Sequence, residues 1–339
     1  MTPTESDDTA AGATDVDTAA ESQDTVTESQ FGTASSVGAS NVVTRREMLA
    51  ALGGASILAS PAESTTDLGE SDVHVRVYPG RLPTYAWARY GWRGARSGWA
   101  PPHEAAYSAV ESALEQFERY RTARGRLEDV DITVERGGRI DLTRHAISSP
   151  RELVSPTQQQ VLDAFRTVLH DRGAITGSCC HLLLWWGPLH HDVGYGGTRS
   201  PNSHVAKIDG EGAQTVANIG ATELWDSRAV TRNIAIHEML HTYLSSRIAN
   251  EVVGSACDHD LGTAIRTDDR TLEVSPIATA YAGPEEMGAG TRFHGTGCHD
   301  HGSFAHHDGF DGIKRFRYTT TLSQTTLEGM TRYLEATLE

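Results

Sequence analysis

The feature that most constrains this chain is a His-Glu-x-x-His pattern, with histidines at positions 237 and 241, inside a largely apolar segment. Apolar side chains recur at steps of three and four along residues 230–248, which predicts a helix buried inside a domain. Positions four apart lie on one face of a helix, so His237 and His241 can aim ring nitrogens at one point. Asp226 or Ser227 can cap the start of this helix.

Two imidazoles one turn apart, with a carboxylate beside them, suit metal-assisted hydrolysis. Neutral His237 and His241 would hold a zinc ion, and zinc lowers the pKa of its bound water to about 7. Glu238 would lie next to the ion without occupying it, where it can take the proton. The competing interpretation is that the two histidines belong to the core and are satisfied by hydrogen bonds.

The motif resembles that of the zincin superfamily of metallopeptidases, over the motif helix and its flanks. The resemblance implies that His237 and His241 are zinc ligands and that Glu238 is the general base. It does not extend to the best-known subfamilies. The metzincin pattern requires Gly and then His or Asp where this chain has Leu244 and Arg247. A Glu at the gluzincin spacing is also missing from the sequence.

A third ligand has to come from outside the motif helix, because a helix can aim only one turn at one ion. Residues 257–262 bring a dense set of donors, and His259 is the first choice. Asp258 and Asp260 are alternatives, either as ligands or as partners that orient a ligating imidazole. Glu251 is a further candidate, and an exposed acidic turn is the alternative interpretation of the whole stretch.

Other residues have weaker indications of function. The segment 274–281 resembles the tight turn beneath the metal in metzincins, with Ile277 where Met is expected. Tyr281 could donate a hydrogen bond to a developing oxyanion, or be a packed tyrosine in a core turn. The histidines of a Gly- and Asp-rich stretch could bind a second metal or be solvated: His294, His299, His301, His306 and His307. Three more are expected to be solvated loop residues: His190, His191 and His204.

The formal charge of −16 is not evenly spread along the chain. Residues 1–44 contain eight Asp or Glu and no Lys or Arg, so we expect a disordered acidic leader. The whole chain has only two lysines, Lys207 and Lys314, among its 29 basic residues. This composition resembles that of proteins from salt-loving archaea. An acidic surface argues against nucleic acid as a partner, because phosphates would be repelled.

The segment 45–62 begins with Arg45 and Arg46 and continues as a short run of small and apolar residues. It resembles a twin-arginine export signal, which implies an extracellular or cell-surface protein. The run is short for a membrane span, so contact with a membrane would require an uncleaved signal. The alternative is an amphipathic helix on a tail. The remaining residues, 63–339, are expected to form one domain.

Residue patterns within this domain predict an α+β, zincin-like fold with a mixed twisted sheet and a smaller irregular C-terminal part. The strand 215–220, just before the motif helix, is expected to be the sheet edge that packs on this helix and pairs with a peptide substrate. The other expected strands are 73–78, 130–134 and 181–186. The expected helices are 104–124, 156–170 and 327–338, and the expected loops are 87–102 and 187–212.

Four cysteines in an exported chain permit disulfides. A bridge between Cys257 and Cys298 would fix the loop that carries His259, whereas a ring joining Cys179 to Cys180 would be strained. The competing idea is thiolate ligation of zinc, which is typical of structural sites.

Two functions remain open from the sequence. The first is an exported zinc-dependent peptidase that acts on peptides or proteins through a zinc-bound water activated by Glu238. The second is a non-catalytic extracellular metal-binding or structural protein in which the His-rich loop matters most.

Overall fold

The computed structural model describes six stretches of the chain: 73–142, 156–187, 195–200, 203–206, 211–278 and 301–338. All of them belong to one compact unit, Ala59–Glu339. The expected leader and signal segment, 1–62, lie outside the described residues, and so does Tyr281. Within the described stretches, no helix has the length and apolar character that crossing a bilayer requires.

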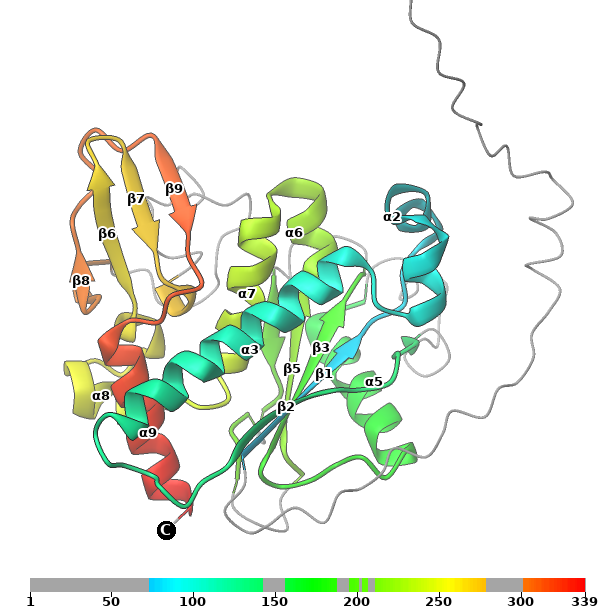
Figure 1. The fold of residues 1–339 in the computed structure, drawn as a ribbon, viewed down its shortest axis with the longest axis horizontal. Helices are drawn as coiled ribbons and strands as arrows, with labels where there is room; N and C mark the ends of the chain where they lie inside the picture. The colour runs from blue at the N-terminus through cyan, green and yellow to red at the C-terminus, as the bar shows by residue number, and fades with distance from the viewer. Residues whose placement is uncertain are drawn as a thin grey trace, which may run out of the picture. The chain divides into compact units, whose positions relative to one another are not determined.

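A five-stranded sheet in the order β2-β1-β3-β5-β4 forms the centre of the fold (Figure 1). Four strands run parallel and the fifth, β4, is antiparallel. Parallel neighbours need long crossovers, and the segments that join β1 to its two parallel neighbours, β2 and β3, contain helices. The strands are β1 Val73–Pro79, β2 Ile132–Arg136, β3 Cys179–Trp185, β4 Gly196–Thr198 and β5 Ala213–Asn218. Helices with a mixed sheet confirm the α+β class.

Helices cover both faces of this sheet, which explains why β1 and β3 are buried at every position. The helices α3 (Pro101–Thr122) and α7 (Arg228–Leu240) pack on one face, against side chains such as Leu182. Helix α5 (Gln158–Asp171) packs on the other face, against Leu183. Because neighbouring side chains of a strand point to opposite faces, burial on both sides selects a continuous apolar run.

The edge of the sheet differs from the prediction. The expected edge strand is β5, but β5 lies between β3 and β4, and the edge is β4. This three-residue strand lies in a stretch expected to be a loop, since Gly196 and Gly197 carry no side chains that could show a strand pattern. Its extended conformation comes from pairing with β5, with Gly196 opposite Ala217.

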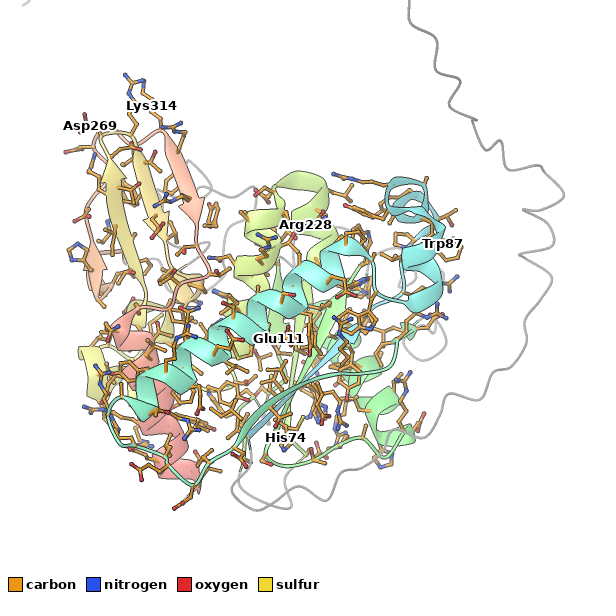
Figure 2. All side chains as sticks on the ribbon, viewed as in Figure 1. His74, Trp87, Glu111, Arg228, Asp269 and Lys314 are labelled. Atoms are coloured by element: carbon orange, nitrogen blue, oxygen red, sulfur yellow. The ribbon has the colours of Figure 1, made fainter. Side chains whose placement is uncertain are left out.

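The expected loop 87–102 is also wrong in part, because helix α2 (Thr84–Ser97) occupies most of it, with a kink at Gly91. Its Gly-, Trp- and Arg-rich composition disfavours a helix, but tertiary contacts override this local preference. Tyr90 Oη donates a hydrogen bond to Glu223 Oε2 at 2.7 Å, and Arg228 Nη2 donates to the same oxygen at 2.8 Å. Figure 2 labels Arg228 among the side chains. Glu223 lies on α6 (Ile219–Trp225), a short helix that the sequence patterns do not predict.

The C-terminal part is more regular than expected, because it contains a second sheet in the order β8-β6-β7-β9. Its strands are β6 Thr263–Asp268, β7 Thr271–Val274, β8 His306–His307 and β9 Arg315–Tyr318. These strands are short and surround only a small apolar cluster, so the sequence gives them little periodic signal. Helix α9 (Gln324–Leu338) closes the chain and begins three residues before the expected start.

A buried polar row crosses four strands of the central sheet. Register places Glu135 beside Arg76, Arg76 beside His181, and His181 beside Gln214. Arg76 Nη2 donates to Glu135 Oε2 at 2.7 Å, and His181 Nδ1 lies 3.1 Å from Tyr78 Oη. Burial and, to a smaller extent, the positive charge of Arg76 together lower the pKa of His181 from 6.5 to about 3. His181 is therefore neutral in the folded protein at pH 5.

His181 should make stability depend on pH. Between pH 6.5 and 3 the unfolded chain binds a proton that the folded protein does not, so the free energy of unfolding falls as pH falls, by about 1.4 kcal/mol per pH unit. His181→Gln should reduce this slope by about that amount. Urea unfolding at pH 7, 6 and 5 measures it, with the exposed His170→Gln as control. Equal slopes in all three proteins would contradict the assignment.

Candidate metal centre

Helix α7 carries the His-Glu-x-x-His pattern and is shorter than predicted. The Ser227 side chain caps its start by accepting a hydrogen bond from Val230 N at 3.4 Å. The expected apolar stripe continued to position 248, but the helix ends at Leu240 and a separate helix, α8 (Ser246–Val253), follows. His241 is the C-cap residue and keeps right-handed helical angles. The one-turn relation between the two histidines therefore survives.

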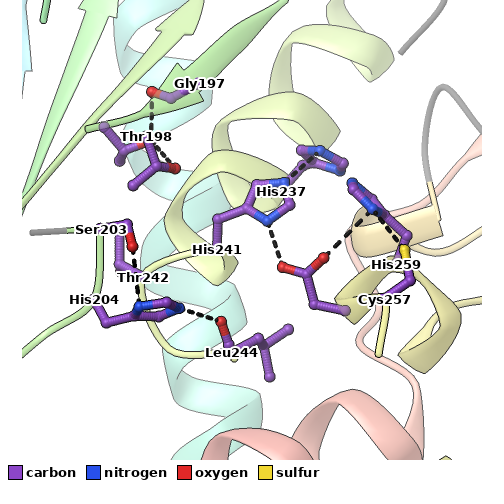
Figure 3. A network of polar contacts seen from close by, with 12 residues as sticks. Gly197, Thr198, Ser203, His204, His237, His241, Thr242, Leu244, Cys257 and His259 are labelled. Carbon is purple, nitrogen blue, oxygen red and sulfur yellow. Dashed lines mark hydrogen bonds and ion pairs between the residues drawn. The ribbon is translucent and has the colours of Figure 1, made fainter. Parts of the chain in front are cut away.

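The rings of His237 and His241 face each other through their Nε2 atoms, which are 3.0 Å apart (Figure 3). His237 Nδ1 donates to the Pro276 carbonyl oxygen at 2.9 Å. His241 Nδ1 donates to Asp258 Oδ2 at 2.7 Å. Since each Nδ1 carries a proton, Nε2 is the nitrogen that each ring offers to a metal. The pKa of His241 is raised to about 9, so this ring would release its Nε2 proton when an ion binds.

His259 joins these two rings from η2 (Asp258–Leu261), a short 3-10 helix in another part of the chain. Its ring centroid lies 5.2 Å from that of His237 and 4.9 Å from that of His241. Each ring offers one nitrogen, and the three nitrogens lie within 4.8 Å of one another. Zinc bonds to nitrogen are about 2.0 Å long, so tetrahedral ligands are separated by roughly 3.4 Å. The three histidines could therefore hold a metal ion after small movements.

The alternative ligands lie in different surroundings. The carboxylate of Asp258 contacts two imidazoles: Oδ2 accepts a hydrogen bond from His241 Nδ1, and Oδ1 lies 3.4 Å from His259 Nδ1. Burial alone would raise the pKa of Asp258, but the charges of the neighbouring histidines and the His241 hydrogen bond hold it well below its usual range. Asp260 is buried and accepts a hydrogen bond from Ser255 Oγ. Glu251 lies on α8 and pairs with Arg247 on the same helix.

The three cysteines in the described part of the chain do not supply a thiolate to this cluster. Cys257 is disulfide-bonded, so its sulfur carries no titratable proton although it lies 3.3 Å from His259 Nδ1. Its expected partner, Cys298, lies outside the described residues. Cys179 and Cys180 are free thiols buried on β3, and burial raises the pKa of Cys179 to about 12. The adjacent pair is therefore not joined.

Glu238 is buried beside the histidine cluster, with 4% of its surface exposed. Burial raises its pKa from 4.5 to about 7, and the Asp258 charge adds to this, against opposing effects of His241 and of a hydrogen bond from Thr215. Its Oε2 has no hydrogen-bond partner among the described residues. A carboxyl group with a pKa near neutrality can both accept and return a proton.

The edge strand β4 lies against this carboxylate. A Cβ atom added to Gly196 would clash with the Val216 carbonyl oxygen and lie 2.5 Å from Glu238 Oε1, both closer than real contacts allow. The absence of a side chain at position 196 thus lets the strand and the carboxylate approach each other. Sequence patterns give no signal for this role, because a glycine in a Gly-rich stretch does not show what it touches.

The other sequence-predicted histidines that the structure describes are not part of the cluster. His204, expected to be solvated, instead bonds through Nε2 to the Leu244 carbonyl oxygen at 2.8 Å, just after α7 (Figure 3). His306 pairs with Asp308 at 2.7 Å, and His307 packs against Phe310. Among the described residues, neither belongs to a second metal-binding group. Several others lie outside the described residues: His190, His191, His294, His299 and Tyr281.

No known family model matches this chain, and no curated protein matches it significantly. The assignment of a chemistry to the cluster therefore depends on its geometry.

Alanine at any one of His237, His241 or His259 should reduce zinc retention, since two nitrogens hold an ion far less tightly than three. Loss of a residue that only orients a ligand weakens metal binding by up to about 100-fold. We expect the loss of a direct ligand to lower zinc affinity by more than this. Metal content after dialysis, determined by mass spectrometry, measures the loss. Glu251→Ala is the control and should retain zinc. Full retention by His259→Ala would remove that residue from the ligand set.

Proposed function

We propose that this chain is an exported, zincin-like zinc-dependent peptidase. The observation that carries the proposal is the convergence of three imidazoles beside the buried carboxylate of Glu238. A ligand set of nitrogen atoms suits zinc, and three protein ligands leave a fourth position for water or substrate, as in catalytic zinc sites. Export rests on the resemblance of residues 45–62 to a twin-arginine signal.

The residues of the cluster have separate tasks. His237, His241 and His259 would hold the ion. When bound, zinc polarises the substrate carbonyl and makes water acidic enough to be deprotonated near pH 7. Glu238 takes a proton from the attacking water at its unpartnered Oε2. It then returns the proton to the amine that leaves when the carbon–nitrogen bond breaks.

Substrate positioning would come from β4. It is the last strand in the sheet order, so among the described residues one side of its backbone has no neighbouring strand in that sheet. An extended peptide can add to such an edge by main-chain hydrogen bonds. Because Gly196 lies against Glu238, a peptide paired there would have its backbone next to the carboxylate.

Glu238→Gln tests the proposal most directly, because an amide cannot accept the proton while the shape of the side chain is kept. We expect zinc to be retained and peptide cleavage to fall by about 10²- to 10⁴-fold. Glu251→Gln, at a partly exposed site on α8, should cleave normally. Cleavage of a mixed peptide library in concentrated salt, followed by mass spectrometry, measures both. A wild type that binds zinc but cleaves no peptide would instead favour a non-catalytic metal-binding protein.

The glycines of β4 allow a second, matched test. Gly196→Ala should separate β4 from the Val216 carbonyl oxygen and from Glu238, and lower kcat at least about 10-fold, since general-base catalysis depends on hydrogen-bond reach. Zinc content should be unchanged because the histidines are not touched. Gly197→Ala adds the same methyl group but meets only the flexible Gln158 side chain, so its kcat should stay near that of the wild type. Equal kcat values for both variants would contradict the role of Gly196.

A further inference from the structure

The carboxylate of Asp258 lies between two imidazoles of the cluster and uses a different oxygen for each. Oδ2 accepts from His241 Nδ1 at 2.7 Å, and Oδ1 faces His259 Nδ1 at 3.4 Å. The side chain is mostly enclosed, with 20% of its surface exposed. One side chain therefore contacts the Nδ1 side of two rings that come from separate elements.

We propose that Asp258 is a positioning residue that fixes the orientation and tautomer of both His241 and His259, and that it is not itself a ligand. This inference rests on the metal site of the proposed function. A carboxylate on Nδ1 holds the proton there and leaves Nε2 unprotonated for a metal. Both oxygens of Asp258 are directed at Nδ1 atoms, on the side of each ring away from Nε2.

The backbone around Asp258 holds the carboxylate in place. Asp258 is the first residue of η2 and His259 is the next, so one turn delivers a ring and its orienting group together. That turn is closed by a hydrogen bond from Gly262 N to the His259 carbonyl oxygen at 2.9 Å. It is tied to the C-terminal part of the chain by Ala305 N, which donates to the Asp260 carbonyl oxygen at 2.7 Å.

His237 provides an internal comparison, because its Nδ1 donates to the Pro276 carbonyl oxygen and not to Asp258. Removing the Asp258 carboxylate should therefore loosen two rings and leave the third in place. We expect zinc affinity to fall in steps, less when one of the two contacts is lost and more when both are lost. A residue with a merely structural role would change the stability of the fold without this stepwise loss of zinc affinity.

The test measures zinc affinity of the full-length chain by competition with a chelator. In Asp258→Asn the amide oxygen can still accept from His241 Nδ1, but the amide nitrogen cannot accept from His259 Nδ1. We expect zinc to bind about 10-fold more weakly in this variant and about 100-fold more weakly in Asp258→Ala, the range known for outer-shell partners. In the cobalt-loaded protein, Asp258→Asn should keep the visible absorption bands of the wild type, because the ligand set is unchanged.

Asp308→Asn is the matched control, since Asp308 also pairs with an imidazole, that of His306 at 2.7 Å, away from the cluster. It should bind zinc as the wild type does. Wild-type affinity in Asp258→Ala would overturn the proposal. A loss in Asp258→Asn as large as in His259→Ala, with altered cobalt bands, would overturn it in favour of Asp258 as a ligand. If the wild type itself binds no zinc, the proposed function fails together with this inference. Zinc binding without peptide cleavage removes only the peptidase.

Discussion

The burial of polar side chains on α7 is the constraint on which the rest of the site depends. Buried imidazole and carboxyl groups are costly unless they find partners, and α7 lies between the central sheet and the C-terminal part of the chain. The partners come from later segments: the Pro276 carbonyl oxygen lies 39 residues after His237, and Asp258 lies 17 residues after His241. The C-terminal segments therefore supply the hydrogen-bond acceptors for the two histidines of the motif helix. The segment that contains Asp258 also contains His259.

Burial in this region also gives neighbouring ionisable groups different pKa values. Glu238 has few compensating contacts, so burial raises its pKa to about 7 and leaves it able to exchange a proton. Asp258 lies among imidazoles, whose charges and hydrogen bonds keep it ionised. For His241, burial lowers the pKa, but the charge and hydrogen bond of Asp258 outweigh this effect and raise it to about 9. Two carboxyl groups in one small region thus differ because their neighbours differ.

Sequence patterns predicted the elements that have long and regular apolar signals. Strands β1 and β3 and helices α3, α5 and α9 occur where they were expected, with shifts of a few residues at their ends. The patterns were wrong for elements whose conformation depends on distant contacts. Strand β4 exists through pairing with β5, and α2 is attached through hydrogen bonds to Glu223 on α6. Local composition at these places favours a loop, so single-residue preferences could not identify them.

For the site, the sequence by itself determined that His237 and His241 lie one helical turn apart with Glu238 beside them, because this follows from helical periodicity alone. It also supplied His259 as a possible third nitrogen, among acidic alternatives that spacing could not separate. Only the tertiary structure decided that His259 faces the other two rings, that Asp258 contacts two imidazoles, and that Gly196 lies against Glu238. The physical reason is that these contacts join segments far apart in the chain, and their geometry is set by how whole elements pack.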